Sequence, residues 1–457
     1  MKKIKVIGVM ILLTLLVTSC KKWIDPAINK DPSKPTDVTM ALLLPSAQTG
    51  LGYAVGGDVK YAASEWMQQM AGGANQPLAY DRYVITQSDV DNAWKWAMYA
   101  GCMKDMADII KKAEEKKAPW YGGIGKVLMA YSIGVMTDLW NDVPYSKAFQ
   151  GDADLTPAYD SQAEVYAAIN TLLDGAIADL GQPSSANLYW PGGEDFIYGG
   201  DPSMWTMAAY SLKARFAIHL AKRNGSAAYT DALTALANGF TGNSDDMSVP
   251  FGTAYNEQNP MFQFSDQRPG DIVVGAYLVD SMIAHADPRL PLFVDTTGGA
   301  VGSHAGQGEG ASLWGPYYAS DNSPVPLISY VELKFIEAEA KLQTGDAPGA
   351  AIAHNEAVAA SLSKFGLTDP AYIAAYGSET GASITLEKII TQKYFALCYQ
   401  IEVYNDYRRT GYPVLVPATN GVISFIPKRY PYPTSERLYN GDNCPDVNIS
   451  TKVWWDN

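Results

Sequence analysis

The sequence predicts a mostly α-helical fold, in which paired helices carry long irregular loops. The first observation is a set of apolar stripes with a spacing of about 3.6 residues, several of them opened by a helix-capping residue. The second is a set of long segments between these stripes, rich in Gly, Pro, Asn and aromatic residues. The third is size, because 457 residues of which 47% are hydrophobic can form a large core.

The first 19 residues have the pattern of a secretory signal peptide. A positively charged start is followed by an apolar run from Val6 to Val17. This run is too short to cross about 30 Å of hydrocarbon as a helix, so it predicts cleavage. The small residues before Cys20 resemble a bacterial lipobox, which predicts that Cys20 is acylated and holds the mature chain on a membrane. The alternative is an ordinary secretory signal with an unmodified cysteine.

Residues 20–37 form a polar stretch that is repeatedly interrupted by proline. Such a composition predicts an extended tether between the lipid and the folded part of the chain. We expect residues 38–457 to form a single α domain with loop insertions.

Helical signals dominate the rest of the chain. A capping box at Ser161–Glu164, an Asp201-Pro202 start and Ser329 each open an apolar stripe, and another stripe ends before Gly411. Helix pairs of similar length joined by short turns favour a solenoid of tetratricopeptide-like hairpins. The strongest predicted helices span 161–180, 201–220, 329–342 and 386–404, with weaker signals at 42–51, 91–112, 122–139, 229–237 and 349–362.

Long irregular loops are predicted between these helices. A rigid helical scaffold that presents such loops is typical of a binding protein, because the scaffold fixes the direction of the loop side chains. The predicted loops span 71–89, 186–200, 240–271, 295–326 and 414–457.

Several chemistries are disfavoured by composition and spacing. A formal net charge of −14, without a basic run that includes aromatic residues, argues against nucleic-acid binding. An odd number of cysteines remains once Cys20 is set aside, so no disulfide framework is predicted. No zinc spacing connects His219, His285, His304 and His354. No cofactor is expected; calcium held by Asp442, Asn443 and Asp446 is the weaker alternative to simple solvation of that loop.

Asp138 and Asp142 are a pair of carboxylates with a spacing that suits catalysis. Four residues apart on a helix, they could face each other at a separation that a retaining glycosidase uses. Their place at a helix end is explained more simply by capping and structural hydrogen bonds. We therefore expect a protein that is not an enzyme, with a glycan-processing hydrolase as the alternative.

A series of motifs in a fixed order extends over nearly the whole mature chain. In this order they resemble the SusD/RagB-like nutrient-binding lipoproteins of Bacteroidetes-type bacteria. The motifs are Leu43-Leu44-Pro45-Ser46-Ala47-Gln48, Asp138-Leu139-Trp140-Asn141-Asp142-Val143-Pro144-Tyr145, Tyr198-Gly199-Gly200-Asp201, Ser211-Leu212-Lys213-Ala214-Arg215, Phe335-Ile336-Glu337-Ala338-Glu339-Ala340, Arg408-Arg409-Thr410-Gly411-Tyr412-Pro413 and Val453-Trp454-Trp455-Asp456.

This resemblance implies four tetratricopeptide-like units and a receptor that captures oligosaccharides or other nutrients at the outer membrane. It also implies a partner, a SusC-like TonB-dependent transporter on which the receptor sits as a lid. A structural scaffold lipoprotein without a ligand is the remaining alternative.

Two aromatic stretches are predicted to form the binding site, because sugars need flat apolar faces beside planar polar groups. They correspond to the early loop and the later insertion from which the family resemblance implies ligand contacts. Trp94 and Trp96 point to different sides of their helix, so one is expected in the core and the other near the site. The predicted ligand-binding residues are Asn75, Gln76, Tyr80, Arg82, Tyr83, Trp96, Trp314, Tyr317 and Tyr318.

Overall fold

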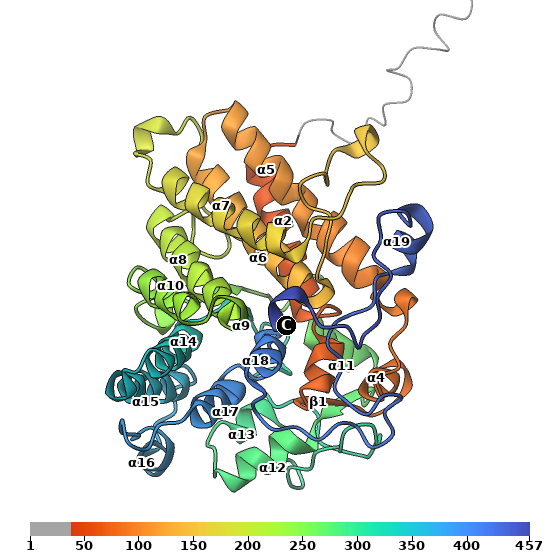
Figure 1. Ribbon diagram of the computed structural model, residues 1–457, viewed down its shortest axis with the longest axis vertical. Helices are drawn as coiled ribbons and strands as arrows, with labels where there is room; N and C mark the ends of the chain where they lie inside the picture. Colours follow the sequence, from red (N-terminus) through yellow and green to blue (C-terminus); the bar gives the residue numbers. More distant parts are fainter. Residues whose placement is uncertain (1–37) are drawn as a thin grey trace, which may run out of the picture.

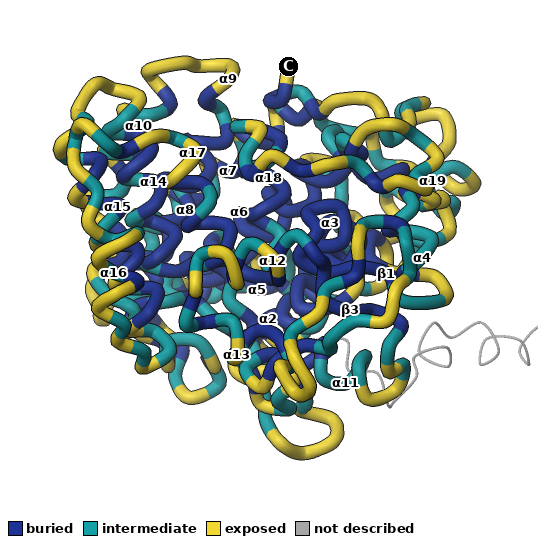
Figure 2. The backbone as a smooth tube through the Cα atoms, turned by 90° about the horizontal axis from the view of Figure 1, so that it is seen from below, coloured by how far each residue is buried: buried dark blue, intermediate teal, exposed yellow. Residues whose placement is uncertain are grey.

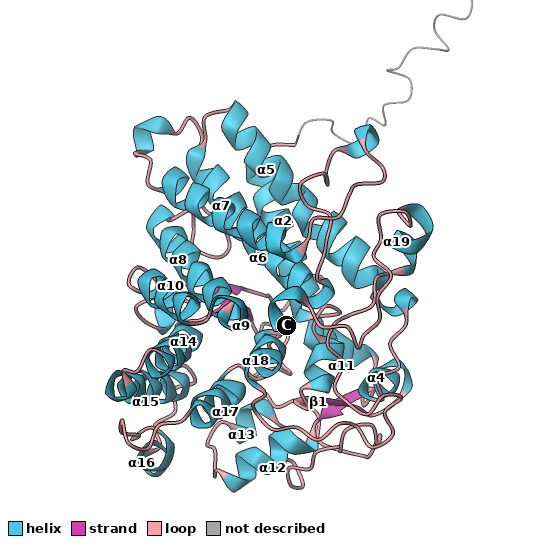
Figure 3. Cartoon of the chain, viewed as in Figure 1, coloured by secondary structure: helices cyan, strands magenta, loops and turns pink. Residues whose placement is uncertain are grey.

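A computed structural model describes residues 38–457, so the predicted signal peptide, Cys20 and the tether lie outside the described residues. Helices dominate this part of the chain, as the sequence predicted, and the strands are short (Figure 3). The helices are α2 (Met40–Gly56), α3 (Tyr61–Trp66), α4 (Asn75–Asp81), α5 (Lys104–Glu115), α6 (Pro119–Trp140), α7 (Gln162–Leu180), α8 (Pro202–His219), α9 (Ala221–Asn224), α10 (Ser226–Leu236), α11 (Pro260–Gln267), α12 (Ala276–Ala284), α13 (Leu290–Phe293), α14 (Tyr330–Gln343), α15 (Ala347–Ser363), α16 (Pro370–Tyr376), α17 (Leu386–Ala396), α18 (Glu402–Thr410) and α19 (Thr434–Tyr439).

Paired helices form the scaffold of the described chain. The pairs are α6 with α7, α8 with α10, and α14 with α15, and α2 packs against both α5 and the π-helix η2 (Asn92–Met103). In Figure 1 these helices follow one another down the left side and through the upper centre, whereas α4, α11 and α19 lie on the right. The tetratricopeptide-like arrangement therefore leaves one flank for shorter elements.

The capping residues that predicted helix starts are at those starts. Ser161 accepts a hydrogen bond from the Glu164 backbone nitrogen at 3.3 Å, and Asp201 accepts one from the Ser203 nitrogen at 2.8 Å. Ser329 caps α14 in the same way. Each side chain satisfies a backbone donor that the first helical turn leaves unpaired, which explains why these boundaries were predictable.

The prediction of one continuous helix over residues 386–404 is wrong at residues 397–401, where the chain breaks between α17 and α18. The chain is helical again from Glu402, and α18 ends before Gly411 as predicted. Tyr399 takes a left-handed backbone conformation with φ of 58°. Its backbone nitrogen donates to Gln69 at 2.7 Å, and the Gln69 amide donates to the Tyr394 carbonyl at 2.9 Å. Contacts from a distant segment therefore replace the helical hydrogen bonds that the apolar stripe predicted.

The predicted loop over residues 71–89 is also partly wrong. It contains α4, the 3-10 turn η1 (Gln87–Val90) and the strand β1 (Met70–Gly72). β1 pairs in antiparallel fashion with β3 (Ile272–Val274), which begins just after the predicted loop 240–271. A second sheet of β2 (Met247–Val249) and β4 (Val325–Ile328) has the same antiparallel order. Pairing between segments about 200 residues apart for β1 and β3, and about 80 for β2 and β4, carries no local sequence signal, so these strands were missed.

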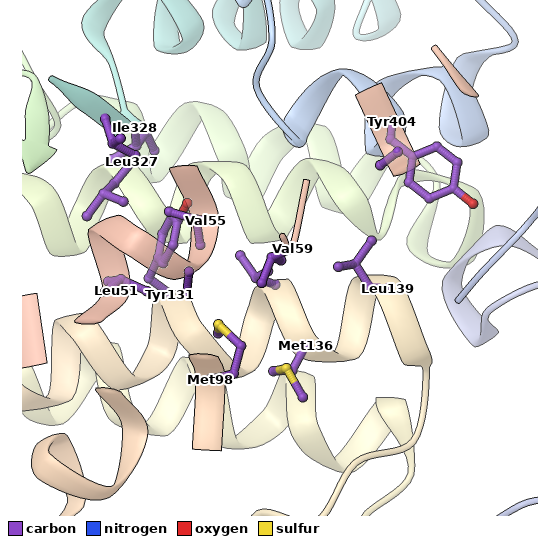
Figure 4. Packing of buried hydrophobic residues seen from close by; sticks show 14 of the residues in the cluster. Leu51, Val55, Val59, Met98, Tyr131, Met136, Leu139, Leu327, Ile328 and Tyr404 are labelled. Carbon is purple, nitrogen blue, oxygen red and sulfur yellow. The ribbon is translucent and has the colours of Figure 1, made fainter. Parts of the chain in front are cut away.

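Most buried apolar residues form one large cluster that runs through the helix pairs, and a smaller cluster lies among α14 to α17. Figure 2 shows the buried backbone in the interior, with exposed segments mainly in the loops around it. In the part of the core shown in Figure 4, residues of α2, η2 and α6 meet Leu327 and Ile328 of β4. Within residues 38–457 no helix has the length and apolar character needed to cross a membrane.

Candidate functional site

A hollow of about 490 Å³ opens on the surface between α2, η2 and α11. Aromatic rings and planar amide side chains alternate along its wall, which is the composition expected for a site that stacks on sugar rings and hydrogen-bonds their hydroxyls. We call it the Trp96 groove. Its side chains include Tyr53, Asn92, Trp96, Gln263, Phe264 and Gln267.

Trp96 is the most prominent ring of the groove. Its side chain is 62% exposed, whereas Trp94, two residues earlier on the same helix, is buried against other aromatic rings. The ammonium group of Lys95 lies 4.9 Å from the centre of the Trp96 ring. The prediction that the two tryptophans separate between core and surface is confirmed, since Trp94 packs and Trp96 borders a hollow.

A smaller hollow of about 90 Å³ adjoins the Trp96 groove on the side of α4. The two hollows share Asp58, Tyr61, Asn92 and Phe264 as lining residues, so they form one continuous depression. The smaller hollow adds polar groups, from Gln76, Asp89 and Arg268, and two further rings, of Tyr80 and Tyr430.

Hydrogen bonds fix the polar wall of this depression. The Gln76 amide donates to Asp89 at 3.0 Å, which ties α4 to η1. Asn75 and Arg268 both donate to the carboxylate of Asp271, at 2.6 and 2.7 Å. These bonds tie α4 to η1 and join α4 to the segment that follows α11.

Close packing of η2 on α2 places Trp96 beside Tyr53. Gly50 on α2 faces Gly101 on η2, and a Cβ atom at Gly50 would lie only 2.0 Å from the Gly101 carbonyl oxygen. No side chain fits there, so glycine at position 50 permits the approach of the two helices. The ring of Tyr53 is held in turn by an edge contact with Phe251, with ring centres 5.3 Å apart.

The tyrosine hydroxyls of the depression remain neutral at ordinary pH. Burial raises the pKa of Tyr80, and the nearby Asp89 carboxylate raises it further. Burial also raises the pKa of Tyr61. Both hydroxyls can therefore donate and accept hydrogen bonds without carrying charge.

Only part of the first predicted aromatic stretch lines the depression. Gln76 and Tyr80 line the smaller hollow, whereas Asn75 lines neither hollow and donates to Asp271. Arg82 points elsewhere and donates to the Gly306 carbonyl at 2.8 Å. Tyr83 is buried, with its hydroxyl accepting from the Ala418 backbone nitrogen at 2.8 Å. The residues also belong mostly to a helix and not to the loop that was predicted.

The second predicted stretch, Trp314 to Tyr318, is corrected by the structure, because it packs into the core. Trp314 and Tyr318 are 4% and 6% exposed, and both contact the ring of Tyr399. The Tyr318 hydroxyl donates to the Cys398 carbonyl at 2.8 Å. Tyr317 packs against Phe293 and Phe365. These rings hold a loop against the scaffold and do not line the Trp96 groove.

Residues of α2 and α11 in the groove were not predicted. Tyr53 lies in α2, where the sequence predicted a helix and no ligand contact. Phe264 lies in a short helix inside a segment predicted to be a loop. Asp201-Pro202 predicted a helix start, and Asn259-Pro260 has the same pattern at the start of α11. That signal could have identified the helix, although not its neighbours in space.

The two carboxylates considered for catalysis are engaged in structural hydrogen bonds. Asp138 is buried and accepts from Tyr166 at 2.6 Å and from the indole nitrogen of Trp455 at 2.8 Å. Asp142 accepts from the Gln162 backbone nitrogen at 2.9 Å. These contacts agree with the structural interpretation of the pair, and neither residue borders the Trp96 groove.

Two further candidate sites carry little weight. A buried void beside Lys60 and Arg215 measures about 20 Å³, which suits a water molecule and not a sugar. Among residues 38–457 no group of three or more His, Cys, Asp or Glu side chains is arranged to hold a metal ion.

The family model described as "Starch-binding associating with outer membrane", SusD-like, matches residues 32–433. No curated protein matches the chain. Among solved structures, a chitin-binding protein is 25% identical with a TM-score of 0.80, and the match covers 92% of this chain and 100% of that one.

Two further structures share the fold at lower identity. A SusD/RagB family protein from Bacteroides thetaiotaomicron is 24% identical with a TM-score of 0.77, over 92% of this chain and 99% of that one. A chitin-binding SusD homolog from Flavobacterium johnsoniae is 23% identical with a TM-score of 0.77, over 92% and 97% of the two chains. The helical scaffold and the match over most of its length agree with the resemblance seen in the sequence, and the chain belongs to the SusD-like family.

Proposed function

We propose that this protein is a non-catalytic receptor that binds oligosaccharides in the Trp96 groove. The single observation that carries this proposal is the exposed Trp96 ring at the edge of a hollow that also presents Tyr53, Phe264 and several amide side chains. A large exposed indole is costly in water unless it contacts a partner, and pyranose C–H groups are well suited to its face.

Binding without turnover is supported by the state of the acidic groups. Asp89, which lines the smaller hollow, accepts hydrogen bonds from Gln76 and from the Thr86 backbone nitrogen at 2.7 Å. Burial raises the pKa of Asp58, and the positive charge of Arg268 lowers it in part. A glycosidase needs a protonated carboxyl group and a second carboxylate that acts on the sugar, and the Asp89 carboxylate is already engaged by Gln76 and Thr86.

Chitin-derived oligosaccharides are the ligand class that we propose first. Two of the structural neighbours are named as chitin-binding, one of them at 25% identity over nearly its full length. The amides of Gln76, Asn92, Gln263 and Gln267 could pair with the acetamido groups of such chains, since an amide both donates and accepts.

We also propose that acylated Cys20 anchors the receptor at the outer membrane, and that a SusC-like TonB-dependent transporter accepts the ligand from it. The family description supports the outer-membrane location. A lid on a transporter would bury a wide face, so the two proteins should co-purify from membranes.

Calorimetric titration of the mature chain with chitin and starch oligosaccharides tests the proposal, with chromatography of the sugars after incubation. Binding of one class without new products supports a receptor. Product formation would point to a glycan-processing hydrolase, and the absence of binding to either class would point to a scaffold without this ligand.

A further inference from the structure

The segment from 187 to 200, between α7 and α8, is fixed to the scaffold at many points. Asp195 is the centre of this attachment. Its carboxylate accepts from the Trp205 indole nitrogen at 2.7 Å, from the Gly200 backbone nitrogen at 2.8 Å and from the Gln48 amide at 2.6 Å. These hydrogen bonds attach the segment to α2 and α8, although it has no regular secondary structure of its own.

A second set of contacts fixes the beginning of the segment. The Leu188 backbone nitrogen donates to the Lys117 carbonyl at 2.9 Å, and Asn187 accepts from the Trp120 backbone nitrogen at 3.0 Å. These bonds attach the segment to the start of α6. Its side chains consequently have a fixed direction.

Despite this attachment, the segment exposes large apolar side chains. We call them the aromatic patch: Leu188, Tyr189, Trp190 and Phe196, which are 62%, 52%, 56% and 49% exposed. A backbone fixed at several points that keeps three aromatic rings and one leucine in water indicates a contact surface, because single exposed apolar residues are common but a fixed group of them is not.

The patch lies at the end of the molecule where the described chain begins. Gln48 of α2 also accepts from the Phe196 backbone nitrogen at 2.9 Å, so the segment rests on the first helix. Leu42, in the first turns of the same helix, is 66% exposed. In Figure 1 the N-terminal end of α2 and the yellow segment after α7 both lie at the upper end, away from α11 and the Trp96 groove.

This position limits the distance between the patch and the membrane. Residues 20–37 number 18, and a chain of that length spans at most about 60 Å when fully extended. If Cys20 is acylated, as the proposed function holds, the start of α2 stays within about 60 Å of the lipid surface. The tether therefore allows the end of the molecule that carries the aromatic patch to reach the membrane.

We infer that the aromatic patch is a second membrane contact, which inserts Tyr189 and Trp190 into the lipid–water interface and orients the receptor on its anchor. Trp and Tyr concentrate at that interface because each ring has an apolar body and one polar atom. Leu188, the preceding residue, supplies further apolar area, and exposed Lys117, whose carbonyl accepts from the Leu188 nitrogen, can reach phosphate groups.

A second glycan site fits these side chains less well. The nearby hollow between α5, α6 and α7, of about 390 Å³, is lined by neither Tyr189 nor Trp190. Two of its charged groups, Lys126 and Asp179, are paired with each other at 2.6 Å. The exposed rings therefore lie outside the hollow that could enclose a sugar, whereas an interfacial contact needs no enclosed site.

Tryptophan fluorescence on vesicles tests this inference. The chain from residue 20 onward, with Cys20→Ser and a histidine tag before it, is attached to vesicles of phosphatidylethanolamine, phosphatidylglycerol and a nickel-chelating lipid. Two vesicle preparations are compared, one with ordinary and one with brominated acyl chains. Bromine quenches the fluorescence of tryptophans that enter the bilayer surface. The tag replaces the lipid anchor, so the test does not depend on acylation of Cys20.

Three proteins are compared: the parent chain, Trp190→Phe, and Trp96→Phe as a matched control at the far groove. Subtracting the emission of Trp190→Phe from that of the parent gives the emission of Trp190 alone, and we expect this emission to be at least twofold lower on brominated vesicles than on ordinary ones. The emission of Trp96, obtained in the same way from Trp96→Phe, should be equal on both kinds of vesicle.

Equal emission of Trp190 on brominated and ordinary vesicles would overturn the inference. A change in the emission of Trp190 when a chitin oligosaccharide is added in the absence of lipid would also overturn it, in favour of a second glycan site. Failure of the proposed function appears separately, as the absence of oligosaccharide binding in calorimetry.

Discussion

The Nε2 atom of His219 lies 2.7 Å from a carboxylate oxygen of Glu402, and both side chains are buried. The other ring nitrogen lies 3.1 Å from Asp138. The imidazole thus connects α8, α18 and the end of α6 in the centre of the scaffold. Burial opposes a charge on the ring, but the two carboxylates outweigh it and raise the pKa of His219 to about 9.

This geometry predicts a contribution to stability that depends on pH. Since the pKa of His219 is higher in the folded than in the unfolded chain, the contribution is complete below about pH 6.5 and disappears as the pH rises through about 9. Urea unfolding at several pH values should show a decline of a few kcal/mol in this window, and the decline should be smaller in His219→Gln. Parallel profiles for both proteins would contradict a charged imidazole.

Lys60 should behave in the opposite way. It is buried with only the Met261 sulfur at 2.9 Å as hydrogen-bond partner, and burial lowers the pKa of Lys60 to about 7. An unfolded lysine stays protonated to about pH 10.4, so the folded chain is penalised most below pH 7 and progressively less above it. Lys60→Met should therefore raise the free energy of unfolding by about 2 kcal/mol or more at pH 6, and by much less at pH 10. Destabilisation at pH 6 would show that the ammonium group has a partner.

The corrected position of Trp314 predicts an effect on stability and not on ligand affinity. Its ring is buried against Tyr399, so Trp314→Ala leaves a cavity and should lower the free energy of unfolding by about 3–5 kcal/mol. Calorimetric affinity for the oligosaccharide, measured well below the melting temperature, should remain within about twofold. A selective loss of binding by a stable variant would restore Trp314 to the site.

The sequence was informative where local interactions decide the structure. The Ser161–Glu164 capping box marks the start of α7, because a side chain and a backbone nitrogen three residues apart meet in any such helix. The separation of Trp94 and Trp96 was equally predictable, since adjacent helical positions turn by about 100°. Both inferences need no knowledge of the remaining chain.

Distant contacts decided what could not be predicted. The break at Tyr399 depends on Gln69, more than 300 residues away, and the apolar stripe across it is continuous in the sequence. The groove likewise joins Tyr53, Trp96 and Phe264 from three separate segments. Trp314 lies in a glycine-rich loop whose composition resembles a binding loop, and only its packing against Tyr399 shows that it belongs to the core.

Calorimetric titration of Trp96→Ala with a chitin oligosaccharide tests the central claim most directly, with Trp190→Ala as an exposed tryptophan outside the groove. Removal of a stacking ring costs about 1.5–2 kcal/mol of apolar contact, so affinity should fall at least about tenfold in Trp96→Ala. Trp190→Ala should bind like the parent protein. Equal affinity of Trp96→Ala and the parent would contradict the assignment of the Trp96 groove as the ligand site.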